Sequence, residues 1–248
     1  MDLTVEKQEW MLANVLSGGT FVNTVFDGVM GLATAGMVGG AKPFFHNLRD
    51  QGKLTNPWFS MYYSNDDTRP GQMIFGGVDE ALIVPGESLV WHLPGPSYPN
   101  YWTVQLERLE VGGKAVYKKG DGGSGYGGTN VAEAMVDSGT SLIMIPSSYV
   151  SDMSVFAVNT DCSNLGSQPE VAIYVKRSDG ATGKYVLTPQ EYTVNRGGSC
   201  LTGIISGGVG SIMVLGDVFV RKYYTAFNFE KGSKAGQVGW APANQNRL

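Results

Sequence analysis

One short stretch of the chain combines a single acid with apolar neighbours and a hydroxyl-rich turn. It reads AMVDSGTSLIMIP, covers residues 134–146, and has its carboxylate at Asp137. Burying an unpaired carboxylate among apolar residues is costly, so this acid needs hydrogen-bond donors. Hydroxyls and tightly turned backbone amides can supply them from the next four residues: Ser138, Gly139, Thr140 and Ser141. The stretch predicts either an ordered turn or an active-site acid, and residue chemistry alone leaves both interpretations open.

A glycine-rich segment lies just before this stretch. Gly123, Gly125 and Gly128 have the G-x-G-x-x-G spacing of a dinucleotide-binding turn. That motif needs a helix after it, whose N-terminus holds the phosphates, but the segment that follows is strand-like. We therefore predict a flexible loop over residues 120–130 and no bound cofactor. The sequence also lacks a P-loop and a G-x-S-x-G nucleophile motif.

The remaining chemistry-bearing residues exclude several other classes of function. His46 and His92 are the only histidines and have no ligand partners nearby in sequence, so we expect no metal site. Cys162 and Cys200 are too far apart for a C-x-x-C motif, which leaves one long-range disulfide or two free thiols. The net charge of −4 and the absence of a Lys/Arg cluster favour neither nucleic acid nor a membrane as a partner.

The elements that must position the acid are mainly strands. Thirty-five glycines, many β-branched and aromatic residues and frequent turn signals predict an all-β fold. We expect strands within six segments: 72–78, 101–113, 134–146, 171–177, 184–194 and 211–220. Alternation in the second segment places Trp102, Val104, Leu106 and Arg108 on one face of its strand. Two helices are expected, over 42–52 and over 146–158, the second with a serine N-cap after Pro146.

The proline-rich segment 84–100 reads as a connector between two units. We place the boundary near Val84, so that residues 1–83 form one unit and residues 84–248 the other. The N-terminus lacks the layout of a signal peptide, and no apolar run is long enough to span a membrane.

The stretch around Asp137 resembles the second active-site signature of the pepsin-like aspartic proteases, D-[ST]-G-[TS]-[SA] with hydrophobic residues on both sides. Six further blocks resemble segments of that family and occur in the family's order: FDGVMGLA (26–33), MIFGGVDEAL (73–82), YWTVQLERLEVGG (101–113), GSCLTGI (198–204), VLGDVFVRKYYTAFNFE (214–230) and VGWAPA (238–243). The resemblance implies a bilobal acid protease fold, with residues 1–83 as the latter part of the N-terminal lobe and 84–248 as a complete C-terminal lobe.

In that family each lobe brings one acid loop, threaded beneath a strand that ends in hydrophobic-hydrophobic-Gly. Two such strands match, at Val29-Met30-Gly31 and Val214-Leu215-Gly216, but Asp137 lies in the only D-[ST]-G of the chain. Met1 falls after the place where family members carry their first catalytic Asp and flap tyrosine. Asp27 and Asp217 match structural positions of the family. The second acid must therefore come from a light chain, from a segment missing in a truncated product, or from a second copy in a homodimer.

The resemblance also assigns roles around the acid. Thr140 should hydrogen-bond the outer oxygen of Asp137, and Ser138 should anchor the loop to its counterpart across the lobes. Backbone groups of Gly139, Thr140 and Ser141 would pair with an extended peptide substrate. Three residues are candidates for apolar subsite walls, with ordinary core packing as the alternative for each: Tyr101, Met135 and Val214.

Cys162 and Cys200 match the disulfide of the family's C-terminal lobe, which favours a secretory, vacuolar or lysosomal compartment. The expected activity is that of an aspartic endopeptidase that acts at acidic pH without a cofactor and is inhibited by pepstatin-type compounds. The alternative is a catalytically inactive module that binds peptides. Under either interpretation the partner is a peptide or protein.

Overall fold

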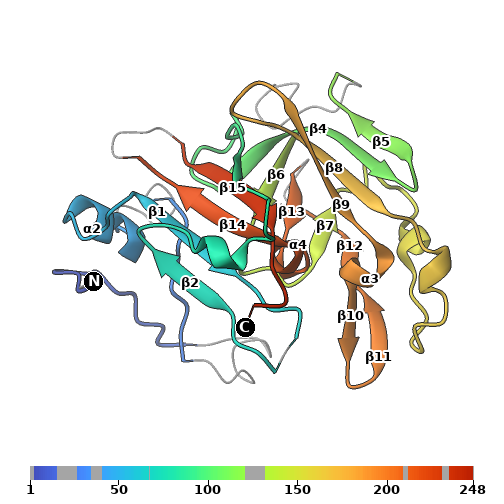
Figure 1. Ribbon diagram of the computed structural model, residues 1–248, viewed down its shortest axis with the longest axis horizontal. Helices are drawn as coiled ribbons and strands as arrows, with labels where there is room; N and C mark the ends of the chain where they lie inside the picture. Colours follow the sequence, from blue (N-terminus) through green and yellow to red (C-terminus); the bar gives the residue numbers. More distant parts are fainter. Residues whose placement is uncertain are drawn as a thin grey trace.

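The computed structural model describes residues 3–15, 27–34, 41–66, 68–120, 132–208, 212–230 and 235–247. Strands dominate these ranges, which confirms the predicted all-β class (Figure 1). The predicted glycine loop, including Gly123, Gly125 and Gly128, lies outside the described residues from position 121 onwards.

One sheet joins segments from both ends of the chain. Its five strands have the order β2 (Gln72–Phe75), β1 (Trp58–Tyr62), β14 (Tyr223–Asn228), β15 (Gln237–Pro242) and β3 (Val90–Trp91). The antiparallel register of β1 and β14 places Phe59 opposite Phe227, whose rings stack with centroids 4.6 Å apart. This sheet takes strands from both sides of the expected boundary near Val84, and that boundary stays a prediction.

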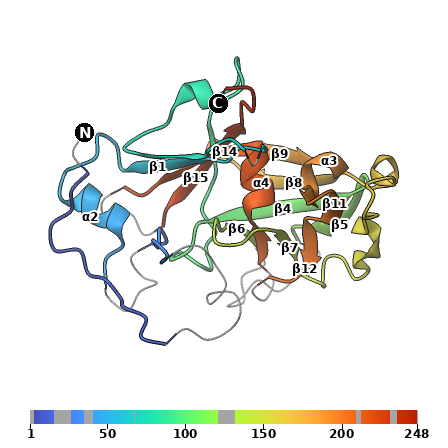
Figure 2. The same cartoon turned by 90° about the horizontal axis from the view of Figure 1, so that it is seen from below.

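The second sheet contains the segment with the acid. Its path runs β12 (Ile204–Ser206), β7 (Ile143–Ile145), β13 (Met213–Leu215), β6 (Ala132–Val136), β4 (Thr103–Val111), β8 (Val171–Lys176) and β9 (Thr182–Leu187). Strand β5 (Lys114–Lys118) pairs with β4, and β10 (Thr193–Arg196) forms a separate hairpin with β11 (Ser199–Thr202). Seen from below, this sheet extends away from α2 and the first residues of the chain (Figure 2).

Of the two expected helices, only the first has formed. Helix α2 (Phe44–Asp50) buries Phe45 and Leu48 and is followed by Gly52 with φ 68°. The prediction of a helix over 146–158 is wrong, because this segment contains only the 3-10 helix η4 (Met153–Phe156). Asp152 caps that turn by accepting a hydrogen bond from the Ser154 amide, in place of the predicted serine cap.

Two segments predicted as continuous strands contain a helix at their centre or end. Segment 184–194 is divided by α3 (Pro189–Tyr192), which starts with proline at its first position and a capping box between Thr188 and Glu191. Segment 211–220 changes from β13 to α4 (Asp217–Lys222) after Gly216. Further short 3-10 helices are η2 (Glu80–Leu82) and η5 (Leu165–Ser167). Apolar runs alone cannot distinguish these short helices from strands.

The predicted alternation along β4 holds only for its first half. Trp102, Val104 and Leu106 are buried, but the register with β8 shifts after Leu106 and the next fully buried residue is Leu109. Arg108 lies beyond this shift and its side chain is 38% exposed, so it does not share the buried face of Trp102, Val104 and Leu106. A β-bulge adds one residue to the strand and reverses the face of everything beyond it, which periodicity alone does not reveal.

Strand β13 lies between β6 and β7 and fixes the loop that joins them. It runs parallel to β6 and antiparallel to β7. Gly216, at the end of β13, lies where an added Cβ would be 2.1 Å from the Thr140 carbonyl oxygen and 2.4 Å from that of Leu142. The expected pairing of Val214-Leu215-Gly216 with the acid loop is therefore present, and only glycine permits the backbones to approach so closely.

Replacing this glycine should destabilise the protein. We expect Gly216→Ala to lower the free energy of unfolding by about 3 kcal/mol or more, because the backbone atoms that meet the new methyl group cannot rotate away. Gly77→Ala is the matched control, since an added Cβ there meets nothing within 4 Å. Urea unfolding followed by far-UV circular dichroism measures both. Equal midpoints for the two variants would contradict the close packing at Gly216.

Cys162 and Cys200 form the predicted disulfide. It links the segment after η4 to strand β11 across 38 positions of sequence. Replacing both cysteines with serine should lower the free energy of unfolding by roughly 3–4 kcal/mol, chiefly by releasing a long loop in the unfolded chain. Denaturant titration of the variant against the oxidised parent measures the loss. A change within experimental error would show that the bridge constrains nothing.

Candidate active site

Asp137 follows directly after β6, at the point where β13 lies alongside. Its backbone amide donates to the Leu215 carbonyl oxygen at 3.1 Å, so the parallel pairing continues into the loop. The Gly139 amide donates to Oδ1 at 2.9 Å, and Thr140 Oγ1 donates to Oδ2 at 2.6 Å. The hydrogen bond expected between Thr140 and Asp137 is thus present. Each carboxylate oxygen has one donor, which orients the carboxylate within a half-buried loop.

The turn after the acid faces outward. Ser138, Gly139 and Ser141 are exposed, while the Thr140 and Ser141 carbonyl oxygens accept the first amides of α4, from Asp217 and Val218. Helix α4 therefore holds the turn from below and leaves its outer surface open. The Ser138 hydroxyl lies close to the phenol of Tyr63, which follows β1, and opposes the rise of its pKa. Anchoring of Ser138 to a counterpart loop stays a prediction.

A cavity of about 410 Å³ opens beside the acid. Its lining includes Asp137, Ser138 and Gly139 together with Tyr101 and Met135, two of the three expected subsite walls. Val214, the third, is 2% exposed and packs behind Met135 in a cluster with Ile212, which agrees with its core-packing alternative. The cavity therefore brings one carboxylate to the edge of a largely apolar space.

The other side of the cavity comes from the segment 27–34. The sequence predicted a second threading strand at Val29-Met30-Gly31, but these residues form no strand, and Val29 and Met30 are 76% and 46% exposed. Hydrogen bonds attach the segment to the loop 94–101 and its neighbour, among them those from Trp102 Nε1 to the Leu32 carbonyl at 2.8 Å and from Thr34 Oγ1 to the Asn100 carbonyl at 2.6 Å. Among the residues that the structure describes, no strands flank this segment as β6 and β7 flank β13.

Asp217 lies at the start of α4, close to Asp137. Burial raises its pKa to about 6; the positive charge of Arg221 opposes this rise, and the negative charge of Asp137 adds to it. Its Oδ1 atom is buried and has no hydrogen-bond partner within the described structure. Asp27, the other acid singled out by the sequence, is exposed. Neither supplies a second carboxylate that shares donors with Asp137.

Two residues near the cavity were missed by the sequence reasoning. Burial raises the pKa of the Tyr63 phenol, the negative charges of Asp217 and Asp137 raise it further, and the Ser138 hydroxyl opposes the rise. Glu133 is buried in β6, on the same face as Met135. The signal for Glu133 was its spacing of four from Asp137 along one strand. Tyr63 had no signal, because tertiary structure alone brings it to Ser138.

No group of three or more potential metal ligands occurs in the described ranges, and none of their helices is long and apolar enough to cross a bilayer.

Comparison with known proteins places the chain in a family. The model of the eukaryotic aspartyl protease family matches residues 1–243. This chain belongs to the eukaryotic aspartyl protease family. It is 32% identical to cathepsin E-B of Xenopus laevis and 30% identical to gastricsin of Mus musculus, each over 97% of this chain, and 31% identical to pepsin A of Sus scrofa over 88%.

This aspartyl protease family member spans only part of these relatives. The aligned region covers 59% of the cathepsin, 60% of the gastricsin and 54% of the pepsin. The family also accounts for the pepsin-like architecture of strands described above.

In this family member the partly buried acid Asp217, next to the site, should make stability depend on pH. The pKa of Asp217 is raised from 3.8 to about 6, so the folded state binds more protons than the unfolded state between these values. The stabilisation is complete below pH 3.8 and is lost as the pH rises through about 6. We expect Asp217→Asn to reduce the fall in melting temperature over this window.

Asp152→Asn is the control for this measurement, because hydrogen bonds from Ser154 lower the pKa of Asp152 and its contribution has the opposite sign. Differential scanning fluorimetry at a series of pH values compares the two variants with the parent. An unchanged pH dependence in Asp217→Asn would show that this carboxyl is not the group that titrates.

Proposed function

We propose that this aspartyl protease family member is an aspartic endopeptidase, or the larger part of one, that hydrolyses internal peptide bonds at acidic pH. The observation that supports it is the carboxylate of Asp137 at the edge of an apolar cavity, with one donor on each oxygen. Those donors fix the orientation of the carboxylate before a substrate arrives, which is what a group that handles a water molecule requires.

The chemistry needs a second carboxylate. Two acids held close together share one proton because like charges so near cannot both ionise. The ionised acid takes a proton from the attacking water, while the protonated acid polarises the peptide carbonyl. Asp137 fills one role, and the 248 residues contain no second D-[ST]-G. The other acid comes from a light chain, from a segment outside these residues or from a second copy of the chain.

The cavity suits an extended peptide with apolar side chains. Tyr101 and Met135 offer apolar walls on one side, and the exposed backbone at Gly139 lies next to the acid. An extended substrate binds such a surface by strand-like backbone pairing, with its side chains alternating into pockets. The expected substrates are therefore peptides or unfolded proteins with bulky apolar residues at the cut, and the expected inhibitors are of the pepstatin type.

The disulfide between Cys162 and Cys200 bears on where such an enzyme works. Disulfides persist in oxidising compartments and are rare in the cytosol. We assign the protein to the secretory pathway, with the vacuolar or lysosomal lumen as the acidic compartments that suit a shared proton.

The presence of a single D-[ST]-G acid, Asp137, also supports a second function. A chain that keeps the apolar cavity but only one carboxylate is suited to hold peptides without cutting them. This peptide-binding module predicts binding without turnover under every condition of assembly.

Cleavage of a denatured protein at acidic pH, with and without pepstatin, tests the proposal. We expect Asp137→Asn to lower pepstatin-sensitive turnover by about 10³-fold or more, because the amide cannot accept the proton of the water. Asp27→Asn is the matched control, because it removes the same negative charge at an exposed position. Cleavage that survives Asp137→Asn would remove this residue from the mechanism.

The source of the second acid is decided by native mass and dilution. Activity that falls on dilution, with one inhibitor bound per dimer, supports the homodimer. Activity that appears only when an N-terminal segment of a relative is added supports the two-piece enzyme. Peptide binding with no turnover in any of these assemblies favours the binding module.

A further inference from the structure

Glu133 is the only acidic side chain in the buried class among the described residues, at 2% exposure. It lies in β6, two positions before Met135, so both side chains are on the same face of the strand, which leads directly into Asp137. In the register with β4, Gln105 lies opposite Glu133 and Thr103 opposite Met135. A carboxylate buried between two such strands is costly unless it holds something in place.

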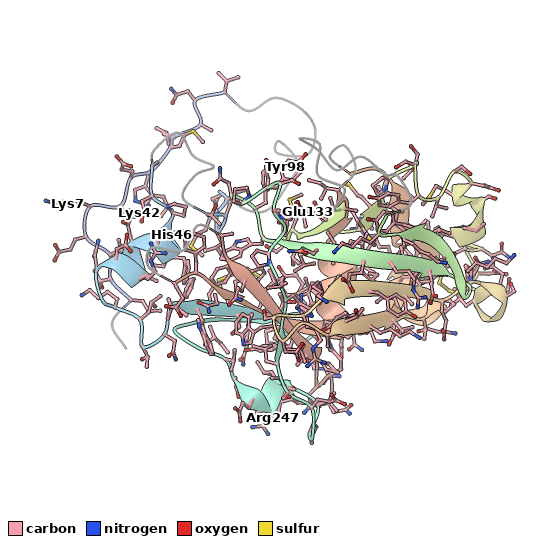
Figure 3. All side chains as sticks on the ribbon, turned by 90° about the horizontal axis from the view of Figure 1, so that it is seen from above. Lys7, Lys42, His46, Tyr98, Glu133 and Arg247 are labelled. Carbon is pink, nitrogen blue, oxygen red and sulfur yellow. A yellow bond between two sulfur atoms is a disulfide. The ribbon has the colours of Figure 1, made fainter. Side chains whose placement is uncertain are left out.

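The group that Glu133 holds is the backbone of the loop 94–101. Its Oε1 accepts a hydrogen bond of 2.6 Å from the Ser97 amide. Figure 3 shows Glu133 beneath the turn that carries Tyr98. Its Oε2 and the neighbouring Thr103 Oγ1 are buried and have no hydrogen-bond partner within the described structure.

Because Gly95 has no side chain, the loop backbone can lie directly against the Glu133 carboxylate. A Cβ added at Gly95 would be 2.0 Å from Glu133 Oε2 and 2.6 Å from Thr103 Oγ1. The start of the loop is attached to β4 as well, because the Gly95 amide donates to the Thr103 carbonyl at 3.1 Å and Gln105 Nε2 donates to the Pro94 carbonyl at 3.0 Å. Beyond Gly95, Glu133 hydrogen-bonds the loop backbone at Ser97.

The far half of the loop carries Tyr101 to the cavity, with Tyr98 packed against it. Tyr98 and Tyr101 lie edge to face with ring centroids 5.9 Å apart and pack on the cluster formed by Met135, Ile212 and Val214. Tyr101 lines the cavity next to Asp137. The position of both rings follows from the backbone of residues 97–101, where the Tyr101 amide donates to the Tyr98 carbonyl at 3.0 Å.

We infer that Glu133 is a positioning residue that fixes the loop 94–101. It thereby fixes Tyr101, the cavity wall that Tyr98 supports and that selects a large apolar substrate side chain beside Asp137. This inference rests on the proposed peptide-binding cavity. A charged acceptor forms a stronger hydrogen bond to a backbone amide than a neutral acceptor does. If the loop moved away, the buried carboxylate would lose this partner, which costs free energy. The carboxylate therefore holds the wall in one place more firmly than an apolar residue would.

Two variants disturb this contact and one preserves it. Glu133→Ala removes the acceptor, and Gly95→Ala displaces the carboxylate through the clash described above. Glu133→Gln keeps an oxygen for the Ser97 amide and can donate to the unpartnered Thr103 hydroxyl. Glu110→Ala is the matched control: this carboxylate in β4 bonds Tyr174 and Arg108 instead of the loop and does not line the cavity.

The first measurement is hydrogen exchange of the loop amides in the full chain. We expect the Ser97 amide to exchange about tenfold faster in Glu133→Ala and Gly95→Ala, as loss of a buried hydrogen bond implies, and at the parent rate in Glu133→Gln and Glu110→Ala. This readout needs neither a substrate nor a second acid.

The second measurement is calorimetric binding of two uncleavable peptides, one with Phe and one with Ala at the position next to the cut. We expect Glu133→Ala and Gly95→Ala to lower the preference for Phe about tenfold, and Glu133→Gln to restore it. If a disruptive variant weakens both peptides equally, or if Ser97 exchange stays at the parent rate, the inference is overturned.

Failure of the proposed function has a different signature. If the parent binds neither peptide, the cavity is not a peptide site and the claim of side-chain selection falls with it. The exchange rates then still decide whether Glu133 holds the loop. If Glu133→Ala does not fold, Gly95→Ala carries both measurements, because it leaves the carboxylate in the chain.

Discussion

The insertion of β13 between β6 and β7 is the constraint on which the rest of the structure depends. Because β13 occupies that gap, the chain that joins β6 to β7 must turn around its end, and the turn contains Asp137. Gly216 lets the backbone at the end of β13 approach the backbone of the acid loop closely. The first amides of α4 then donate hydrogen bonds to the Thr140 and Ser141 carbonyl oxygens. The acid loop is thus held by backbone contacts below and left open above, which a site for an extended peptide requires.

Three carboxylates near the cavity are partly or fully removed from water, and their surroundings compensate the cost of desolvation in different ways. Asp137 is half buried and receives a donor on each oxygen. Asp217 has one oxygen without a partner, and burial raises its pKa to about 6. Glu133 is the most deeply buried and bonds a backbone amide of the loop above the cavity. Removing each carboxylate from water costs free energy of desolvation. Acids in such positions therefore tend to occur where they hold other groups in place or take part in a reaction.

The cavity joins parts of the chain that are far apart in sequence. Strand β1 contributes Phe59 and Met61, the segment 27–34 contributes its exposed apolar residues, and β6 contributes Met135 and the acid. The sheet that carries β1 is completed by β14 and β15 from the C-terminal end. The two walls of the cavity therefore belong to different sheets, which meet at a shared aromatic core where Trp102 contacts Phe59 and Phe227.

The sequence by itself determined the all-β class, the position of helix α2, the disulfide pairing by resemblance, and Asp137 with its Thr140 donor. The class and the helix depend on local composition and periodicity, which short-range chemistry specifies, whereas the disulfide and the role of Thr140 followed from the family resemblance. Only the tertiary structure decided that β4 has a bulge after Leu106, that α3 and α4 interrupt expected strands, and that Val29-Met30-Gly31 forms no strand. It also decided that Glu133 meets the Ser97 amide and Ser138 meets Tyr63. Such contacts join residues distant in the chain, and their free energy depends on burial and register that no local pattern contains.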